Sequence, residues 1–139
     1  MRWLVIAVVL AFAQTSVADE TTFVVIVNRS NDVTKLDKKT VADAFLKKRT
    51  HWNGDRLIKP VDQRRGSATR RRFSEDVLGR SVASVRTYWN QLLFSGRGVP
   101  PPELDSDAAV IKYVAGHDGA IGYVSQSTDL KAVNVVQLR

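Results

Sequence analysis

An unbroken run of β-branched and aromatic residues, Thr22 to Val27 (TFVVIV), lies near the start of the chain. A strand with one face in water alternates apolar and polar residues, but this run has no polar residue after Thr22. Such a run is typical of a strand buried on both faces, which needs a covering layer on each side of the sheet. Because parallel sheets are the usual setting for such strands, the run predicts the interior of an α/β fold.

The rest of the chain supplies helices and strands for that fold. Asp37, Ser67, Ser81 and Ser106 are good N-cap residues, and apolar residues at helical spacing follow them. The stretch 95–104 is rich in glycine and proline and is expected to be a loop. The order of elements predicts a mainly parallel sheet flanked by helices, in a single domain. The expected helices are 37–48, 67–78, 81–94 and 106–114, and the expected strands are 22–27, 57–61, 120–124 and 133–138.

The first eighteen residues have the pattern of a secretory signal. Arg2 gives a basic start, the eleven residues from Trp3 to Ala13 are apolar, and Ser16-Val17-Ala18 has small residues where a signal peptidase cleaves. A membrane anchor is the alternative, but the apolar run is shorter than the roughly 20 residues that a span requires. We therefore expect cleavage after Ala18, no membrane span in the mature domain 19–139, and a periplasmic or secreted location. Export argues against a nucleic-acid target.

The composition also limits the chemistry. The chain has no cysteine, which excludes disulfides and thiolate metal sites. Its two histidines, His51 and His117, lie in different loops, and no cluster of metal-binding side chains has the spacing of a ligand set. Ser67 has no nearby base in the sequence and does not lie in a nucleophile elbow. We expect no metal, no cofactor and no catalytic activity.

The candidate binding site is the stretch from Arg64 to Phe73 (RRGSATRRRF), in which no acidic residue occurs. A strand is expected to end near Val61, and Gly66, Ser67, Ala68 and Thr69 would then begin a helix. The free N–H groups and positive dipole end of such a helix start can bind an oxyanion, with Arg64 or Arg65 assisting. The alternative is a capped helix with a solvated basic face. The pattern alone leaves both interpretations open.

The next three arginines, Arg70 to Arg72, would lie in the first turn of this helix, where the helix dipole disfavours cations. Consecutive helical positions point about 100° apart, so at most one or two of these three can face one ligand. Most of this charge is therefore expected on the surface. The net charge of +7 still favours an anionic partner.

Taken together, these segments resemble the phosphate-binding component of phosphate ABC transporters, within the periplasmic binding protein superfamily. The chain is similar to the short, single-domain relatives of that component, over nearly its whole mature length. The resemblance implies a type II fold and phosphate held at the helix start by backbone and hydroxyl donors. It also implies a non-catalytic role and an ABC permease or an envelope sensor as a partner. The segments that carry it are VVIVN (24–28), AFLKKRTHWNGDRLIKPVDQRRGSATRRRF (44–73), YWNQLLFSGRG (88–98) and GAIGYV (119–124).

The chain departs from the family pattern in sequence and in length. Gln63 replaces an arginine, Arg65 replaces an aspartate that accepts a proton from phosphate, and Ala68 replaces a glycine. Residues 19–139 suffice for one lobe, whereas full members hold the ligand between two lobes. Two further interpretations stay open. One is an envelope protein-interaction module with a vestigial anion site. The other, which the spread of the basic residues disfavours, is a polyanion binder whose affinity falls steeply with salt.

Overall fold

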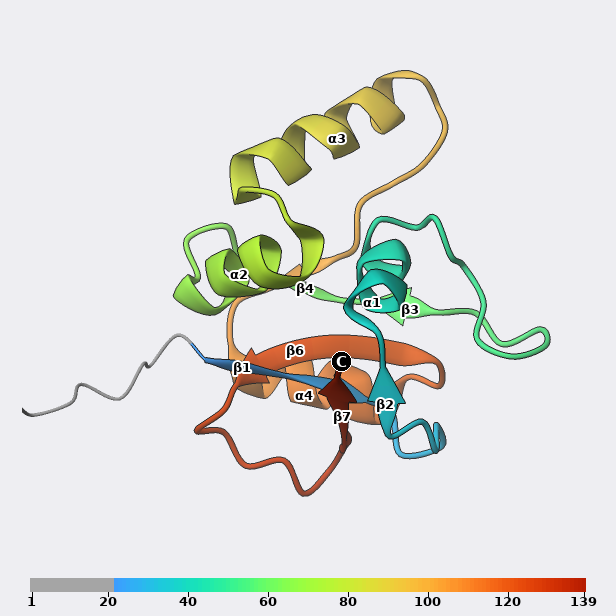
Figure 1. Ribbon diagram of the computed structural model, residues 1–139, viewed down its shortest axis with the longest axis vertical. Helices are drawn as coiled ribbons and strands as arrows, with labels where there is room; N and C mark the ends of the chain where they lie inside the picture. Colours follow the sequence, from blue (N-terminus) through green and yellow to red (C-terminus); the bar gives the residue numbers. More distant parts are fainter. Residues whose placement is uncertain (1–21) are drawn as a thin grey trace, which may run out of the picture.

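The computed structural model describes residues 22–139, and the expected signal peptide lies outside them. Its centre is a five-stranded sheet with the strand order β2-β7-β1-β6-β3 (Figure 1). A separate pair of short strands, β4 and β5, lies beside it. The strands are β1 Phe23–Val27, β2 Lys35–Leu36, β3 Lys59–Pro60, β4 Asp62–Gln63, β5 Glu103–Leu104, β6 Ala120–Ser125 and β7 Asn134–Leu138.

The β1 strand lies in the middle of the sheet, and Val25, Ile26 and Val27 are at most 1% exposed, as the apolar run predicted. The expectation of a mainly parallel sheet needs correction, because β1 pairs antiparallel with both β6 and β7. Only the outer pairs, β2 with β7 and β3 with β6, are parallel. An apolar run encodes burial on two faces, and burial does not fix the direction of the neighbouring strands.

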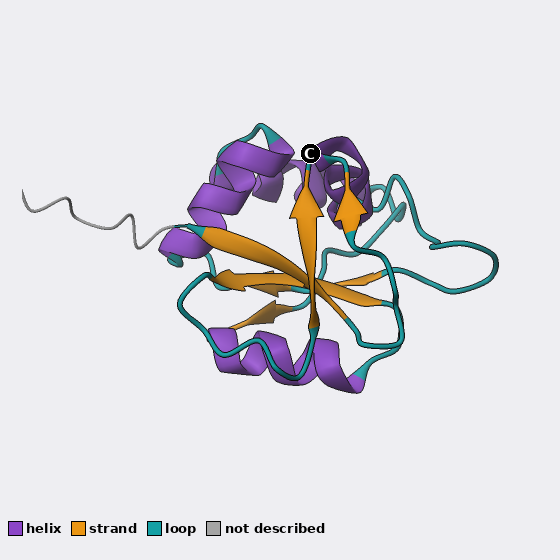
Figure 2. Ribbon diagram, turned by 60° about the horizontal axis from the view of Figure 1, so that its bottom comes forward, coloured by secondary structure: helices purple, strands orange, loops and turns teal. Residues whose placement is uncertain are grey.

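Helices cover both faces of the sheet (Figure 2). The helices α1 and α2 lie on one face, α4 lies on the other, and α3 packs outside α2 (Figure 1). Ser67, Ser81 and Ser106 each accept a hydrogen bond from a first-turn N–H, as expected of N-caps. Asp37 makes no such bond and pairs with Arg139 instead. The helices are α1 Lys38–Phe45, α2 Ala68–Phe73, which continues as a π-helical turn η1 Ser74–Leu78, α3 Val82–Phe94 and α4 Asp107–Gly116.

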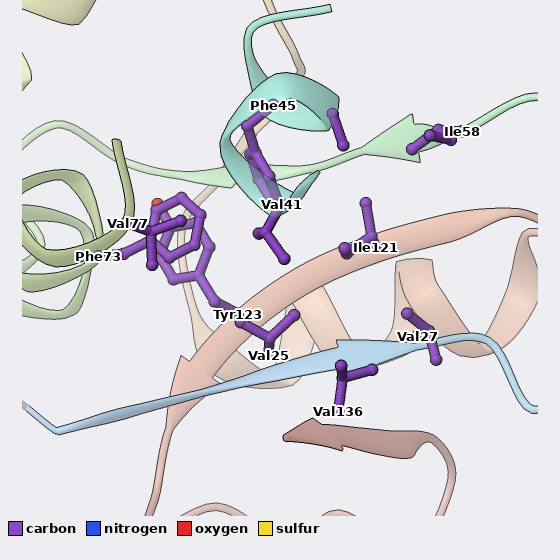
Figure 3. Packing of buried hydrophobic residues seen from close by; sticks show 11 residues of the cluster. Val25, Val27, Val41, Phe45, Ile58, Phe73, Val77, Ile121, Tyr123 and Val136 are labelled. Carbon is purple, nitrogen blue, oxygen red and sulfur yellow. The ribbon is translucent and has the colours of Figure 1, made fainter. Parts of the chain in front are cut away.

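The face under α1 and α2 has an aromatic core (Figure 3). The rings of Phe73 and Tyr123 stack with centroids 3.9 Å apart, and Phe45 lies 4.7 Å from Phe73. These rings join α1, α2 and β6 into one cluster with β1. The cluster fixes where α2 starts relative to the end of β6, because Phe73 ends α2 and Tyr123 lies within β6.

The opposite face is aliphatic and depends on a glycine. A Cβ added to Gly122 would lie 2.8 Å from Val110 Cγ1 of α4 and 3.0 Å from Val61 Cγ1. The first contact is shorter than real Cβ atoms essentially ever show, and the second is tighter than most of them. The missing side chain therefore lets α4 pack directly on β6, which brings the start of α4 close to β4.

The strands β4 and β5 were not expected from the sequence. They pair in parallel over two residues each, with Asp62 opposite Glu103 and Gln63 opposite Leu104. The second of these strands lies in the stretch predicted to be a featureless loop. Two residues are too few to show any periodicity, so only the fold reveals the pair. Its consequence is that α2 and α4 begin next to each other.

Candidate functional site

The predicted helix start lies just beyond the carboxyl end of β4. The N–H of Arg64 donates to Leu104 O (3.0 Å), which continues the pairing with β5. The chain then turns, with Ser67 N–H donating to Arg64 O (3.0 Å), and enters α2 at Ala68. The structure thus brings Gly66, Ser67, Ala68 and Thr69 together at one helix N-terminus, as the sequence predicted.

The Ser67 hydroxyl is already engaged within the protein. Its oxygen accepts from Arg70 N–H (3.1 Å) as the N-cap, and its proton is donated to Gln63 Oε1 (2.8 Å). Gln63 is in turn fixed, since its Nε2 donates to Asp107 Oδ1 (2.8 Å) and to Tyr123 O (2.9 Å). Gln63, which replaces the arginine of the family pattern, therefore acts as an anchor for the cap.

Free donors remain next to this cap. Within residues 22–139, no hydrogen-bond acceptor pairs with the N–H of Ala68, the N–H of Thr69 or the Thr69 hydroxyl. Thr69 is 9% exposed as a whole residue, and Asn31 Nδ2, not the Thr69 hydroxyl, is the unpaired side-chain atom that is fully buried among residues 22–139. Two backbone N–H groups and a hydroxyl at the positive end of a helix form a cradle that suits an oxyanion.

The two arginines before the helix have different surroundings. Arg64 is exposed, and its Nη1 lies 3.9 Å from the position that a Cβ on Gly66 would occupy. Arg65 instead lies near β5, where its Nε is 3.8 Å from Glu103 Oε1. Arg64 therefore lies beside Gly66 at the helix start, and Arg65 is partly neutralised by a carboxylate.

Arg70 is the arginine whose place the sequence could not indicate. Its side chain is 7% exposed, with Nε 3.4 Å from Asp62 Oδ1 and Nη1 3.2 Å from Glu103 Oε2. Its Nη1 also donates to Gln63 O (2.8 Å). Arg71 and Arg72 are exposed, as predicted for this basic run. Arg70 therefore links α2 to β4 and β5 by its ion pairs with Asp62 and Glu103.

Asp62 is the acidic centre of this cluster. The Tyr123 hydroxyl donates to Asp62 Oδ1, and Gln63 N–H donates to the same oxygen (3.0 Å). Burial raises the pKa of Asp62 above its ordinary value, and this effect outweighs the opposing influence of Arg70 and the hydrogen bonds. The pKa of Tyr123 is also raised, first by burial and then by the Asp62 carboxylate. A small cavity of about 100 Å³ lies beside the cluster, lined in part by Arg65, Arg70 and Arg86.

The start of α4 meets the same glutamine from the other side. Ser106 caps this helix, and Asp107 occupies its first turn. The Asp107 carboxylate accepts from Gln63 Nε2 and, at 3.0 Å, from the Thr128 hydroxyl. The positive end of α4 is thus matched by a carboxylate of the chain itself, whereas the first turn of α2 contains no acidic residue.

We also searched the described part of the chain for a metal site and for a membrane-spanning helix. Residues 22–139 contain no group of three or more His, Cys, Asp or Glu side chains that could hold a metal ion. His51 lies beside Thr50, and His117 lies against Tyr113. No helix among these residues has both the length and the apolar character that crossing a membrane requires.

Comparison with known proteins agrees with this architecture. The fold matches a protein from Clostridium perfringens, assigned as a phosphate ABC transporter substrate-binding protein and solved with bound phosphate. The TM-score is 0.68 at 25% identity, over 84% of this chain and 44% of that one. An ABC-type phosphate transport receptor from Vibrio cholerae matches with a TM-score of 0.64 at 23% identity, over 84% and 45%. PstS from Borrelia burgdorferi matches with a TM-score of 0.59 at 13% identity, over 84% and 47%.

These matches define how much of such a protein is present. The chain spans less than half the length of the solved structures that it matches, which corresponds to about one lobe. Among curated protein sequences, none matches the chain. A sequence profile of the PBP superfamily domain matches residues 20–137, nearly all of the chain that the structure describes. The chain therefore belongs to the PBP superfamily.

Proposed function

We propose that this chain is an exported, non-catalytic module that binds phosphate or a similar small oxyanion at the start of α2. The observation that carries the proposal is the unmatched helix start. The N–H groups of Ala68 and Thr69 and the Thr69 hydroxyl have no acceptor among residues 22–139, and the first turn of α2 has no acid. Relatives of similar fold include a substrate-binding protein solved with phosphate.

The donors define what kind of anion would fit. An oxyanion placed on Ala68 and Thr69 N–H would receive two or three hydrogen bonds, and Arg64 beside Gly66 would add a charge-assisted contact. Ser67 would serve as the cap and keep its hydroxyl on Gln63 rather than on the ligand. Arg65 stands where a proton-accepting aspartate would select a protonated phosphate. We therefore expect weak discrimination between phosphate and sulfate.

The length of the chain sets the expected strength of binding. A single lobe leaves one side of the anion in water, where the high dielectric constant weakens every charged contact. We expect dissociation constants in the millimolar range for the isolated domain. A partner that covers the open side, such as an ABC permease or an envelope sensor, would raise the affinity. The same proposal places the protein in the periplasm or outside the cell, which fractionation of the native host would test.

A ligand-dependent stability measurement tests the proposal. Phosphate at ten times its dissociation constant would stabilise the domain by about 1.4 kcal/mol, which is visible as a rise in Tm. Thr69→Val removes the free hydroxyl and should reduce that rise, whereas Ser106→Ala, which removes the cap of α4, should lower Tm but keep the rise. If phosphate and sulfate both leave the Tm of the wild type unchanged, the proposal is wrong.

A second function has one specific observation in its favour. At the end of α3, Phe94 is 93% exposed, Val99 is 59% exposed and Leu93 is 46% exposed. Such a cluster would suit an envelope protein partner, with the anion site vestigial. Phe94→Ser would then abolish the complex, and Thr69→Val would leave it intact. A complex that Thr69→Val weakens would favour the oxyanion module instead.

A further inference from the structure

A second cavity lies at the other end of β6 from the start of α2. Its volume is about 420 Å³, within the usual range for small-molecule sites. The loop between β1 and β2 contributes Asn31 and Asp32, and the loop between α1 and β3 contributes Arg49, Trp52 and Arg56. The second of these loops extends on the right of Figure 1, whereas α2 lies on the left. The cavity is therefore separate from the proposed oxyanion site.

The walls of this cavity are fixed by hydrogen bonds to the sheet. The indole Nε1 of Trp52 donates to Gly119 O (2.9 Å), just before β6 begins. The N–H of Trp52 donates to Arg56 O (2.8 Å), which closes the loop on itself. Gly119 has a φ of 80°, and a Cβ there would overlap the Leu57 carbonyl oxygen. The aromatic side chain is thus held at a defined place in the cavity wall.

The side chain of Asn31 carries an unpaired buried donor. Asn31 is 6% exposed, and its Nδ2 has no hydrogen-bond partner among the described residues. Its other polar groups are paired, because Oδ1 accepts from Val33 N–H (3.1 Å) and the backbone oxygen accepts from Asn134 Nδ2 (3.0 Å). Rotating the amide would place a donor against Val33 N–H, so the orientation is fixed. Buried amide donors in native proteins are nearly always paired, and this one indicates an acceptor that the chain itself does not supply.

The charged groups around the cavity indicate which acceptor fits. Arg49 donates from Nε to His51 O (3.3 Å), and within residues 22–139 no carboxylate pairs with it. Arg56 has a long contact of 3.7 Å from Nε to Asp118 Oδ1 and donates from Nη1 to Ser30 O (3.4 Å), which leaves Nη2 without a partner among residues 22–139. Asp32 forms no ion pair within the same range and can accept from hydroxyl groups. The cavity thus combines two cations, an amide donor, a carboxylate acceptor and an aromatic ring.

We propose that this cavity binds a small hydroxylated anion of the class of acidic or phosphorylated monosaccharides. The carboxylate or phosphate would lie against Arg49 and Arg56. Asn31 Nδ2 is closed to solvent in this structure, so it would donate to the anion after a small shift of its loop and would then gain the acceptor that it lacks. The hydroxyl groups of the sugar would donate to Asp32, and its apolar ring face would pack on Trp52. The inference does not depend on the proposed function, because it uses no residue of the α2 start.

Titration of the ¹⁵N-labelled protein tests this site atom by atom. Glucuronate and glucose 6-phosphate serve as probes for the two anionic groups, with uncharged glucose and inorganic phosphate for comparison. We expect at least one acidic sugar to shift the Asn31 side-chain amide and the Trp52 indole N–H saturably, at concentrations at which glucose does not. Inorganic phosphate should shift Ala68 and Thr69 rather than these two signals.

Substitutions separate specific binding from a general charge effect. Arg49→Gln should weaken the binding of the acidic sugar at least tenfold, and Arg97→Gln, which changes another exposed arginine in the loop after α3, should leave it unchanged. Thr69→Val should also leave it unchanged, which distinguishes failure here from failure at α2. The proposal is overturned if neither acidic sugar moves the Asn31 amide, or if Arg49→Gln and Arg97→Gln have the same affinity.

Discussion

The starts of α2 and α4 have the same local structure, but only α4 has an acidic residue in its first turn. Each follows a two-residue strand, β4 or β5, and each begins at a serine that caps its first turn. At α4 the chain supplies Asp107, whose carboxylate lies at the positive end of the helix. At α2 it supplies no acid, and Arg64 and Arg65 precede the helix. A helix start that lacks its own carboxylate next to one that has it is where an external anion is expected.

Gln63 links the two starts and makes them a single unit. Its Oε1 accepts from the cap of α2, and its Nε2 donates to the first-turn acid of α4. The amide therefore transmits the position of one helix start to the other. The two starts differ in the charged group near the positive end of the helix, which is the Asp107 carboxylate at α4 and no acidic residue at α2. Substitutions can add or remove these groups one at a time.

The largest effect on stability is expected from Arg70, the buried arginine that holds the start of α2 in place. Arg70→Met would leave Asp62 buried without its cation and should destabilise the fold by about 3–5 kcal/mol in chemical denaturation. The exposed neighbour provides the control, since Arg71→Met should change stability by no more than about 0.5 kcal/mol. Equal effects of the two changes would mean that the cluster contributes nothing to α2.

The two capping serines should differ in importance. Ser106→Ala removes one cap hydrogen bond and should cost about 1 kcal/mol. Ser67→Ala removes a cap and also leaves Gln63 Oε1 without its donor, so a loss of about 2 kcal/mol is expected. Denaturation of both variants under the same conditions gives the comparison. A smaller loss for Ser67→Ala than for Ser106→Ala would show that Gln63 does not depend on the α2 cap.

The pH dependence of stability should report on Asp62. Its pKa is raised in the folded state, so the folded protein keeps this proton after the unfolded chain has lost it. The contribution of Asp62 to stability is then fully present below the ordinary aspartate pKa, near 3.8, and decreases as pH rises through the folded value. Each unit by which the pKa is raised corresponds to about 1.4 kcal/mol.

Asp62→Asn removes the titration of this carboxylate and keeps the size of the side chain. The free energy of unfolding of the wild type, minus that of the variant, should fall as pH increases from about 4 towards neutral. Urea denaturation across that range measures the difference. A difference that rises with pH would indicate that Arg70 dominates and that the pKa of Asp62 is lowered.

The substitution with the smallest expected effect on stability gives the start of α2 the carboxylate that the start of α4 already has. Ala68→Asp places a carboxylate in the first turn of α2, as Asp107 does in α4, and should stabilise the fold by about 0.5 kcal/mol at low ionic strength. Ala68→Asn has the same size without the charge and should not show this gain. Thermal unfolding at low and high salt separates the two variants. A loss of stability with Asp alone would mean that the dipole end of α2 is already matched.

The parts of this arrangement that were predictable are local ones. The serine caps depend on residues three positions apart, and the burial of β1 depends on its own composition, so both could be recognised in the sequence. Pro60 cannot donate to a strand ladder, which restricts it to a strand end or edge, and it ends the edge strand β3. The Gly66–Thr69 helix start was predicted for the same local reason.

The parts that could not be predicted depend on contacts between distant segments. The pairing of β4 with β5 joins residues about forty positions apart over only two rows. Arg70 looks the same in sequence as Arg71 and Arg72, and only the phase of the helix against that pair buries one of them. The same applies to Asn31, whose unpaired amide appears only once the loops around it are in place.

The central claim is that the start of α2 is open to an external anion. A phosphate titration of the ¹⁵N-labelled wild type and of Ala68→Asp tests it most directly, with Ala68→Asn as the uncharged match. We expect saturable shifts of the N–H signals of residue 68 and Thr69 in the wild type and in Ala68→Asn, and none in Ala68→Asp. Shifts of equal size in all three proteins, or no saturable shift at these two amides in the wild type, would contradict it.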